Sequence, residues 1–378
     1  MSLGVLTLLI AAGLAGPLLA NTRRSLAPVV VGEIVAGLLI GRTGFDLVPL
    51  GDPTTRFLSD CGFLVLMFSA GTHVPLRDPA LRRALRAAAT AVLASALLAI
   101  PLGFAIARIA GHGHGLIWSV LLATGSAAIV APLLTEGGAV DARGETALAW
   151  ATIADVATIA ALPLVLVTGG AARATLGGLA VTAAALGLFG VALLVSRSDL
   201  TDRLRARSGE RYWALDLRLS LLALFALGWL ARKLGTSTLV AGFSAGLLVG
   251  ARGGPARLST QVIGVANGFF VPLFFVILGA KLDLRALASD HTALLLAALL
   301  AGANGLLHLA VARALRLGSG VGLIATAQLG VPAAVASIGL AQGTLTGAQA
   351  AAVVTAALAT LGFAALGARL LSRPVEPA

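Results

Sequence analysis

The sequence has 378 residues, of which 58% are hydrophobic and 11% are charged, and its formal net charge is +11. Soluble domains carry roughly 25% charged residues, so this composition excludes an ordinary soluble protein. A single cysteine excludes a disulfide scaffold, and the high hydrophobicity excludes a disordered chain. The composition therefore predicts a polytopic all-α protein whose surroundings are a lipid bilayer.

Apolar stretches separated by short polar breaks predict about thirteen transmembrane helices. They cover residues 2–20, 27–41, 56–71, 84–108, 115–135, 144–168, 174–195, 213–231, 236–250, 261–280, 291–312, 317–341 and 346–371. No basic segment precedes the first stretch, so we expect a retained helix rather than a cleaved signal peptide. Trp118, Trp150, Tyr212 and Trp213 lie near the ends of stretches, where aromatic side chains typically sit at the membrane interface.

The basic residues are distributed unevenly among the connections. Connections after odd-numbered stretches hold eighteen, and those after even-numbered stretches hold eight. The positive-inside rule then predicts an outside N-terminus and a cytoplasmic C-terminus, and we expect the protein to lie in the cell (inner) membrane. The longest connection, near 196–212, mixes arginines with three acids, which indicates a solvated linker rather than a nucleic-acid site.

Two pairs of segments indicate an internal duplication. PVVVGEIVAGLLIG (Pro28–Gly41) and STLVAGFSAGLLVG (Ser237–Gly250) are identical at six of fourteen positions, and Phe63–Arg77 resembles Val271–Arg285 downstream. The matched stretches are seven apart, an odd number, so the halves must be inverted relative to each other, as in many secondary transporters. We expect one transmembrane domain over 1–378, with repeat one at about 2–168, a linker helix at 174–195 and repeat two at about 213–371.

Each half also contains a predicted helix interruption. Thr124-Gly125-Ser126, followed by Pro132, lies in the fifth stretch, and Gln328–Pro332 lies in the corresponding twelfth stretch. Gly and Pro interrupt the helical hydrogen bonds, and the freed carbonyl groups can then face an ion. The alternative is a kinked helix with close packing of small residues.

Asp155 is the leading candidate functional residue. It lies near the centre of the sixth stretch, ten residues after Glu145 and eighteen before Arg173. An ionised carboxylate at the centre of a bilayer is costly, so it must be paired, hydrated or protonated. A carboxyl that holds either a proton or a cation can couple the movements of the two. The alternative is a protonated structural aspartate bonded across helices.

Other intramembrane polar residues are weaker candidates. Glu33, near the middle of the second stretch, could line a pathway or bond to irregular backbone. His308 lies one turn after Asn304, on the same helix face, and could be a proton relay, although we favour a hydrogen-bonded core residue. His112 and His114 have no third ligand nearby, so we predict no metal site and no cofactor.

Four segments carry a family resemblance that runs through nearly the whole chain. PVVVGEIVAGLLIG, FLVLMFSAG, VAGFSAGLLVG and VPLFFVILGAKLDL resemble the bacterial monovalent cation:proton antiporters of the sodium/proton exchanger superfamily. The resemblance implies a transporter rather than an enzyme, with sodium or potassium and the proton as substrates. It also implies thirteen helices in inverted repeats, two crossing broken helices, a core domain moving against a dimerisation domain, hence a homodimer, and an embedded aspartate at Asp155.

The chain departs from the family pattern at three positions. Ala154 stands where the family has an Asp, Asn or Gln, Asn304 where it often has a Lys or Arg, and His73 where it has an acid. One core carboxylate and no core base favour electroneutral exchange. Thr124, Ser126 and nearby carbonyl groups would supply oxygen ligands for the cation. Gln328, in the second interruption, is a further candidate for ion binding. Asn304 would donate a hydrogen bond to Asp155.

Two other functions stay open at this point. The same fold could export an organic molecule in exchange for protons, or the chain could be a non-transporting sensor or channel. An intramembrane aspartyl protease is poorly supported, because it needs two facing catalytic carboxyls and Asp155 has no partner motif.

Overall fold

The computed structural model describes residues 1–20, 29–72, 79–111, 113–136, 141–166, 171–195, 213–234, 237–252 and 264–371. Within these ranges the chain is helical and contains no strand, so the predicted all-α class is confirmed. His73, His112, Tyr212 and the connection at 196–212 lie outside the described residues.

The helices follow the predicted stretches closely. In chain order they are α1 (Leu3–Gly13), α2 (Ala15–Ala20), α3 (Val29–Ile40), α4 (Pro53–Thr72), α5 (Pro79–Ile109), α6 (Gly115–Ala123), α7 (Ala127–Glu136), α8 (Ala142–Leu166), α9 (Ala171–Val195), α11 (Leu215–Lys233), α12 (Thr238–Arg252), the π-helical turn η1 (Ala266–Phe270), α14 (Val271–Lys281), α15 (Leu284–Ser289), α16 (His291–Ala314), α17 (Ser319–Ala325), α18 (Gly330–Gln342) and α19 (Gly347–Leu371).

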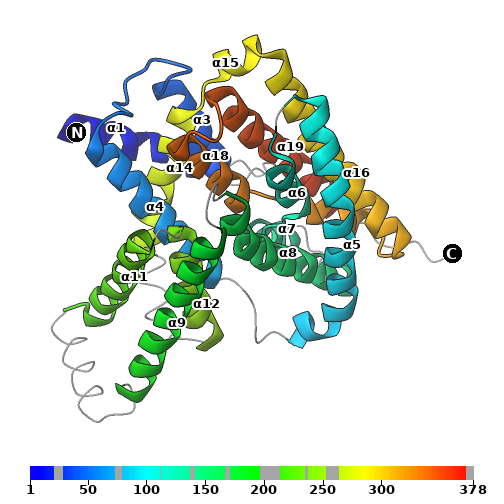
Figure 1. Cartoon of the computed structure of the whole chain (residues 1–378), viewed down its shortest axis with the longest axis horizontal. Helices are drawn as coiled ribbons and strands as arrows, with labels where there is room; N and C mark the ends of the chain where they lie inside the picture. Colours follow the sequence, from blue (N-terminus) through cyan, green and yellow to red (C-terminus); the bar gives the residue numbers. More distant parts are fainter. Residues whose placement is uncertain are drawn as a thin grey trace. The chain divides into compact units, whose positions relative to one another are not determined.

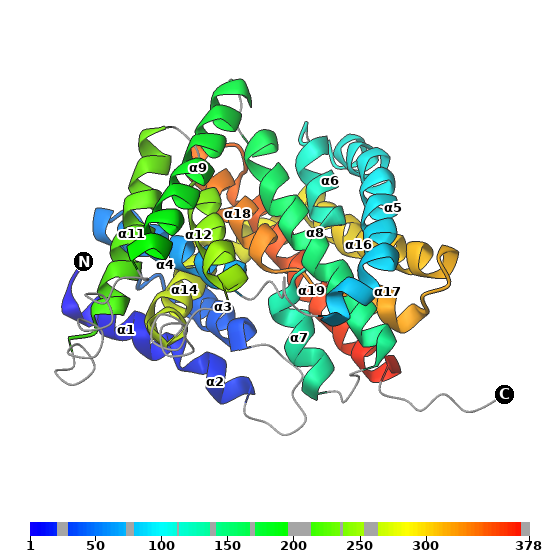
Figure 2. The ribbon, with the colours of Figure 1, turned by 90° about the horizontal axis from the view of Figure 1, so that it is seen from below.

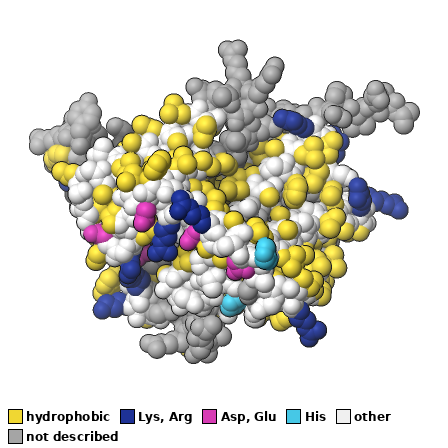
Figure 3. All heavy atoms as spheres, turned by 90° about the horizontal axis from the view of Figure 1, so that it is seen from above, with side chains coloured by type: hydrophobic (Ala, Val, Ile, Leu, Met, Phe, Trp, Pro, Cys, Tyr) yellow, Lys and Arg dark blue, Asp and Glu magenta, His cyan; other side chains and the backbone are white. Residues whose placement is uncertain are grey.

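Seven helical segments of the described chain are long and apolar enough to cross a membrane. They are Leu3–Ala20, Ala84–Ile109, Gly115–Leu134, Ala142–Leu166, His291–Ala314, Ser319–Gln342 and Gly347–Leu371. Large apolar side chains on α5, such as Leu93, Leu97 and Phe104, are exposed, and the face in Figure 3 shows hydrophobic side chains spread between sparse basic ones. An apolar exterior of this kind suits contact with lipid, and the multi-pass membrane character is confirmed.

The helices group into two compact units. Unit 1 comprises Met1–Ser59, Arg77–Leu166 and Phe275–Ala378, and unit 2 comprises Asp60–Leu76 and Val167–Phe274. In unit 2, α9, α11 and α12 pack on one another, as Figures 1 and 2 both show. In unit 1, α8 packs against α5, α6, α7, α17 and α18, and α16 packs against α5, α6, α17 and α19. These helices enclose the polar residues that follow.

Both predicted helix interruptions are present in unit 1. The chain leaves the helical conformation at 124–126, between α6 and α7, and at 326–329, between α17 and α18. Neither break lies at its proline: Pro132 is inside α7, and Pro332 is in the first turn of α18, where a missing backbone N–H costs little. The second break therefore begins two residues earlier than the predicted Gln328–Pro332.

The prediction that Trp118 and Trp150 lie at the membrane interface is wrong. Both side chains are fully buried, because α6 and α8 are covered by other helices of unit 1. Only a helix with a lipid-facing end can place its aromatic side chain at the interface, and sequence position alone does not reveal which helices are covered.

Within unit 1, α3 and α14 meet along glycines. A Cβ at Gly37 would collide with the carbonyl of Val276, and a Cβ at Gly279 would collide with the carbonyl of Ile34. Only glycine allows the two backbones to approach this closely.

Within unit 2, α4 and α12 meet in the same manner. A Cβ at Gly246 would collide with the carbonyl of Phe68, and a Cβ at Gly71 would collide with the carbonyl of Phe243. Each unit thus contains one close, glycine-lined helix pair.

Candidate functional site

Asp155 lies in the middle of α8 and is only 8% exposed. The backbone N–H of Ala127 donates a hydrogen bond to its carboxylate. Ala127 is the first residue of α7, so the carboxylate faces the amino end of a helix that starts inside the protein. Free N–H groups and the helix dipole make such an end favourable for negative charge. The amino end of α7, which the first interruption creates, therefore stabilises the negative charge of Asp155.

A pair of threonine hydroxyls lies beside this carboxylate. The hydroxyl oxygens of Thr124 and Thr158 are 2.8 Å apart, and Thr158 also lies 2.6 Å from the Ala154 carbonyl oxygen. Because a carbonyl can only accept, Thr158 donates to Ala154 and Thr124 donates to Thr158. Thr158 is almost one turn after Asp155, so both side chains lie on a similar face of α8.

The first interruption packs directly onto that face of α8. A Cβ at Gly125 would lie 2.8 Å from the Cα of Ala151, which is one turn before Asp155. The carbonyl of Ser126 accepts from the amides of Ile129 and Val130 and so starts α7. Thr124, Ser126 and Asp155 are all buried, and the structure brings these three predicted residues to one place.

Asn304 and Gln328 are buried but have other surroundings. The Asn304 amide nitrogen donates to the carbonyl of Leu122, at 3.4 Å, near the end of α6, instead of bonding to Asp155. Its Oδ1 and the Oε1 of Gln328 have no hydrogen-bond partner among the described residues. Gln328 lies in the second interruption, whose helix α18 packs on α8. Both residues therefore present an unused acceptor inside unit 1.

Glu33 stands apart from the other candidates. It is buried on α3, next to Gly16 of α2, and its Oε2 has no partner in the described chain. The contacts of the described residues do not connect it to Asp155.

His308 is completely buried on α16, and its ring stacks on Trp150 with the ring centres 5.2 Å apart. Its Nδ1 lies 2.9 Å from the Asn304 carbonyl oxygen, but its Nε2 has no partner among the described residues. The expected fully hydrogen-bonded core histidine is thus only half satisfied.

Three groups that contact the candidate site residues were not predicted from the sequence. The Ala127 amide is a backbone group, which no residue type reveals. Thr158 follows Asp155 by three residues, and helical spacing could have revealed it. Trp150 was interpreted as an interfacial aromatic, so its stacking on His308 was not expected.

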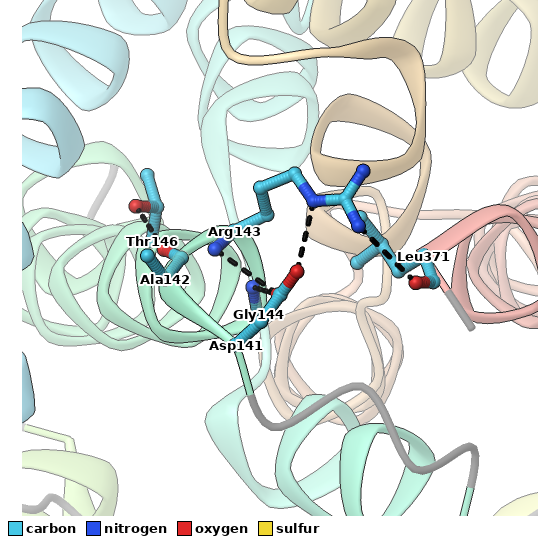
Figure 4. A network of polar contacts seen from close by, with 6 residues as sticks. All are labelled: Asp141, Ala142, Arg143, Gly144, Thr146 and Leu371. Carbon is cyan, nitrogen blue, oxygen red and sulfur yellow. Dashed lines mark hydrogen bonds and ion pairs between the residues drawn. The ribbon is translucent and has the colours of Figure 1, made fainter. Parts of the chain in front are cut away.

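A polar network holds the start of α8 (Figure 4). The Asp141 carboxylate accepts from the backbone amides of Arg143 and Gly144 and from the Arg143 Nε at 2.9 Å. Arg143 also donates to the Leu371 carbonyl at the end of α19. Partial burial alone would raise the pKa of Asp141, but these hydrogen bonds and the guanidinium charge together lower it. The network caps α8 and ties it to α19.

A family model described as "Sodium/hydrogen exchanger, transmembrane" matches residues 5–372. The chain belongs to the sodium/hydrogen exchanger family. The resemblance noted in the sequence is thereby confirmed, and this family is one of transporters rather than enzymes.

Curated relatives carry antiporter names. The chain is 29% identical to the putative Na(+)/H(+) antiporter YjbQ of Bacillus subtilis over 75% of its own length and 48% of that protein. It is 26% identical to the probable Na(+)/H(+) antiporter 3 of Methanocaldococcus jannaschii, over 68% of this chain and 66% of that one. It is 24% identical to the Na(+)/H(+)-K(+) antiporter GerN of Bacillus cereus, over 68% and 65%. The chain thus spans from about half to just under two thirds of these relatives' lengths.

A solved structure shares the fold. The sodium proton antiporter MjNhaP1 from Methanocaldococcus jannaschii superposes with a TM-score of 0.65 over 98% of both chains, at 15% identity. An antiporter fold therefore extends over nearly the whole chain.

Proposed function

We propose that this chain exchanges protons for a monovalent cation, sodium or potassium, across a membrane by alternating access. The observation that carries the proposal is Asp155, a buried carboxyl midway along an apolar helix, hydrogen-bonded by the Ala127 amide at the start of a half-helix. A carboxylate in this position can hold a cation or a proton but not both, and this competition couples the two movements. The names of the relatives point to the same substrates.

Oxygen atoms around the first interruption would complete the cation site, because small hard cations prefer oxygen ligands. Thr124 and Ser126 are the nearest candidates, since they lie in the break that faces Asp155. The free Oε1 of Gln328 would add a ligand from the second interruption. Asn304 would act differently, by holding the end of α6 through Leu122. One carboxylate without a lysine or arginine beside it gives one proton per cation, an electroneutral exchange.

The proposed architecture has thirteen spans in two inverted repeats, with crossing interruptions. The two glycine-lined helix pairs support it. When the repeats are aligned, Gly37 corresponds to Gly246 and Gly279 to Gly71, and the backbone groups that these glycines touch correspond as well. Each repeat therefore supplies one helix to each pair. Two repeats related by inverted symmetry would produce this arrangement. The chain would form one exchanger domain with repeats at about 2–168 and 213–371, joined by the helix at 174–195.

We further propose that the protein lies in the cell (inner) membrane as a homodimer, with the N-terminus outside and the C-terminus in the cytoplasm. The excess of basic residues in odd-numbered connections supports this orientation. Cysteine labelling from either side of the membrane, at the exposed ends of α5 and α16, tests it.

The decisive experiment measures proton flux in everted vesicles after addition of sodium, potassium or lithium. Asp155→Asn keeps the side-chain shape but removes the charge, and exchange should fall to background. Asp60→Asn is the matched control, because Asp60 is exposed and pairs with Arg232 at 3.0 Å, and it should retain exchange. Wild-type exchange in Asp155→Asn contradicts the proposal. A proton flux that responds to an organic solute and to no cation would favour organic export instead.

A further inference from the structure

Three buried side chains of unit 1 each carry a polar atom that has no hydrogen-bond partner in the described chain. The atoms are Nε1 of Trp150 on α8 and, on α16, Oδ1 of Asn304 and Nε2 of His308. All three residues are completely buried. Burying an unpaired polar atom is costly, and nearly all such atoms in proteins bond to protein or to ordered water. These atoms therefore need a partner that the described side chains and backbone do not supply.

The stacking of His308 on Trp150 brings two of these atoms into one region. The ring centres are 5.2 Å apart, and the ring planes are inclined by only 24°. The indole N–H and the imidazole lone pair each lie in the plane of their own ring, so in a nearly parallel stack neither points at the other ring. The two nitrogens therefore do not bond directly, but one atom placed beside the stack can bond to both.

Asn304 lies next to this stack. It precedes His308 by one helical turn, and its backbone carbonyl oxygen lies 2.9 Å from Nδ1 of His308. Its side-chain nitrogen donates to the carbonyl of Leu122 on α6 at 3.4 Å, and α6 in turn packs on α8. The side-chain amide of Asn304 therefore lies where α16 meets α6, close to the helix that carries Trp150.

The printed contacts decide which of these atoms donate and which accept. A carbonyl can only accept, so Nδ1 of His308 carries the hydrogen, and Nε2 of the neutral ring is an acceptor. No charged side chain interacts with this ring in the described chain, and an isolated buried charge is costly, so we expect the neutral ring. The group thus contains one donor, the Trp150 N–H, and two acceptors, Nε2 of His308 and Oδ1 of Asn304.

One donor and two acceptors select the class of ligand. The indole N–H repels a cation, the two acceptors repel an anion, and either ion would be an uncompensated charge in an apolar interior. Water accepts from one group and donates to two others, and a buried water in a protein typically makes about three hydrogen bonds. A single water molecule therefore matches the three unpaired atoms in number and in polarity.

We propose that Trp150, Asn304 and His308 form a binding site for one ordered water molecule. The water accepts from Nε1 of Trp150 and donates to Nε2 of His308 and Oδ1 of Asn304, so that all three atoms are paired. It joins α8 to α16, and Asn304 extends the link to Leu122, two residues before the first interruption. The site thus fixes the end of α6 relative to α8, and it does so whether or not the chain exchanges protons.

Nuclear magnetic resonance of purified wild-type protein with ¹⁵N-labelled tryptophan tests the proposal. The Trp150 indole signal is the one that disappears in Trp150→Phe. We expect its N–H proton to resonate where a hydrogen-bonded indole does and to show a cross peak with water. Because the described protein groups do not accept from this N–H, that cross peak reports the proposed ligand. A Trp150 signal at the position of a free indole, or one without a water cross peak, overturns the proposal.

His308→Phe keeps a stacking ring but removes both ring nitrogens. The water then loses an acceptor, so the Trp150 cross peak should be lost and its N–H signal should move toward the free position. The buried indole of Trp118, which also has an unpartnered Nε1 in the described chain, should keep its signal, and His291→Phe, at an exposed position of α16, should leave Trp150 unchanged. A water cross peak of Trp150 that persists in His308→Phe overturns the shared site. Neither measurement depends on vesicle exchange, so failure of the exchange function is distinguished from failure of this inference.

Discussion

The two interrupted helices of unit 1 share a plan but differ in chemistry. Each break begins with a threonine, Thr124 after α6 and Thr326 after α17. The Thr124 hydroxyl bonds to a side chain of α8, whereas the Thr326 hydroxyl bonds to backbone carbonyls, of Leu323 at 2.6 Å and Thr360 at 3.2 Å. The hydroxyl that begins the first break therefore contacts a polar side chain of α8, whereas the hydroxyl that begins the second contacts backbone carbonyls of α17 and α19.

Charge separates the two breaks as well. The Ala127 amide at the start of α7 bonds to the carboxylate of Asp155, whereas no side chain caps the start of α18 in the described chain. A helix amino end next to a carboxylate is stabilised by it, but one next to neutral groups must rely on hydrogen bonds. The comparison teaches that a duplicated backbone feature need not carry duplicated chemistry, and that the ion should be sought at the first break.

The largest expected effect comes from removing the backbone donor at the first break. Ala127→Pro deletes the N–H that bonds to Asp155, and proline is tolerated at the first position of a helix. A hydrogen bond to a charged group contributes about 1.5–3 kcal/mol, so the cation concentration for half-maximal exchange should rise about 10- to 100-fold. Ala127→Gly keeps the N–H and is the control. Unchanged vesicle exchange in Ala127→Pro would show that this amide plays no part.

A smaller effect should separate the two threonines. Thr124→Val removes a neutral ligand and should raise the half-maximal cation concentration about tenfold. Thr326→Val removes only backbone contacts of the second break, so it should lower thermal stability by about 1 kcal/mol and leave the cation dependence unchanged. Vesicle exchange and thermal unfolding of the purified variants give the two readings. If both variants change the half-maximal cation concentration equally, the two breaks would contribute equally to cation binding, contrary to our expectation.

The helices and their interruptions could be predicted from the sequence because each depends on residues that are adjacent in the chain. Apolar length gives the spans, and Thr124-Gly125-Ser126 gives the first break within its three residues. Asp155 was accessible for a related reason, since an acid within an apolar run is rare. What a side chain touches depends on helices distant in sequence, so the stacking of Trp150 on His308 and the Leu122 partner of Asn304 were not predictable.

Gln328 offers a way to test whether the second break contributes a ligand. Its Oε1 is buried without a partner in the described chain, so Gln328→Leu removes an unpaired polar atom and should leave stability unchanged or raised. If the oxygen binds the cation, the half-maximal concentration should rise about 3- to 10-fold. A variant that is more stable and has wild-type cation dependence would assign the site to the first break alone.

The smallest effect concerns the network that ties the helix carrying Asp155 to α19, the neighbour of the second break. Asp141→Ala removes the cap of α8 and should cost about 1 kcal/mol of stability, whereas Asp141→Asn keeps a capping side chain and loses only the attraction to Arg143. Thermal unfolding of both variants against wild type measures the difference.

The pH dependence of that difference has a definite sign. Because the pKa of Asp141 is lowered in the folded protein, its contribution is fully present above the ordinary aspartate value of about 3.9 and is lost as pH falls through the lower, folded-state value. Wild type should therefore exceed Asp141→Asn in stability at neutral pH, and the two should converge under strong acid. A difference that persists there would show that it does not arise from the charge of Asp141, and would exclude the attraction between Asp141 and Arg143 as its cause.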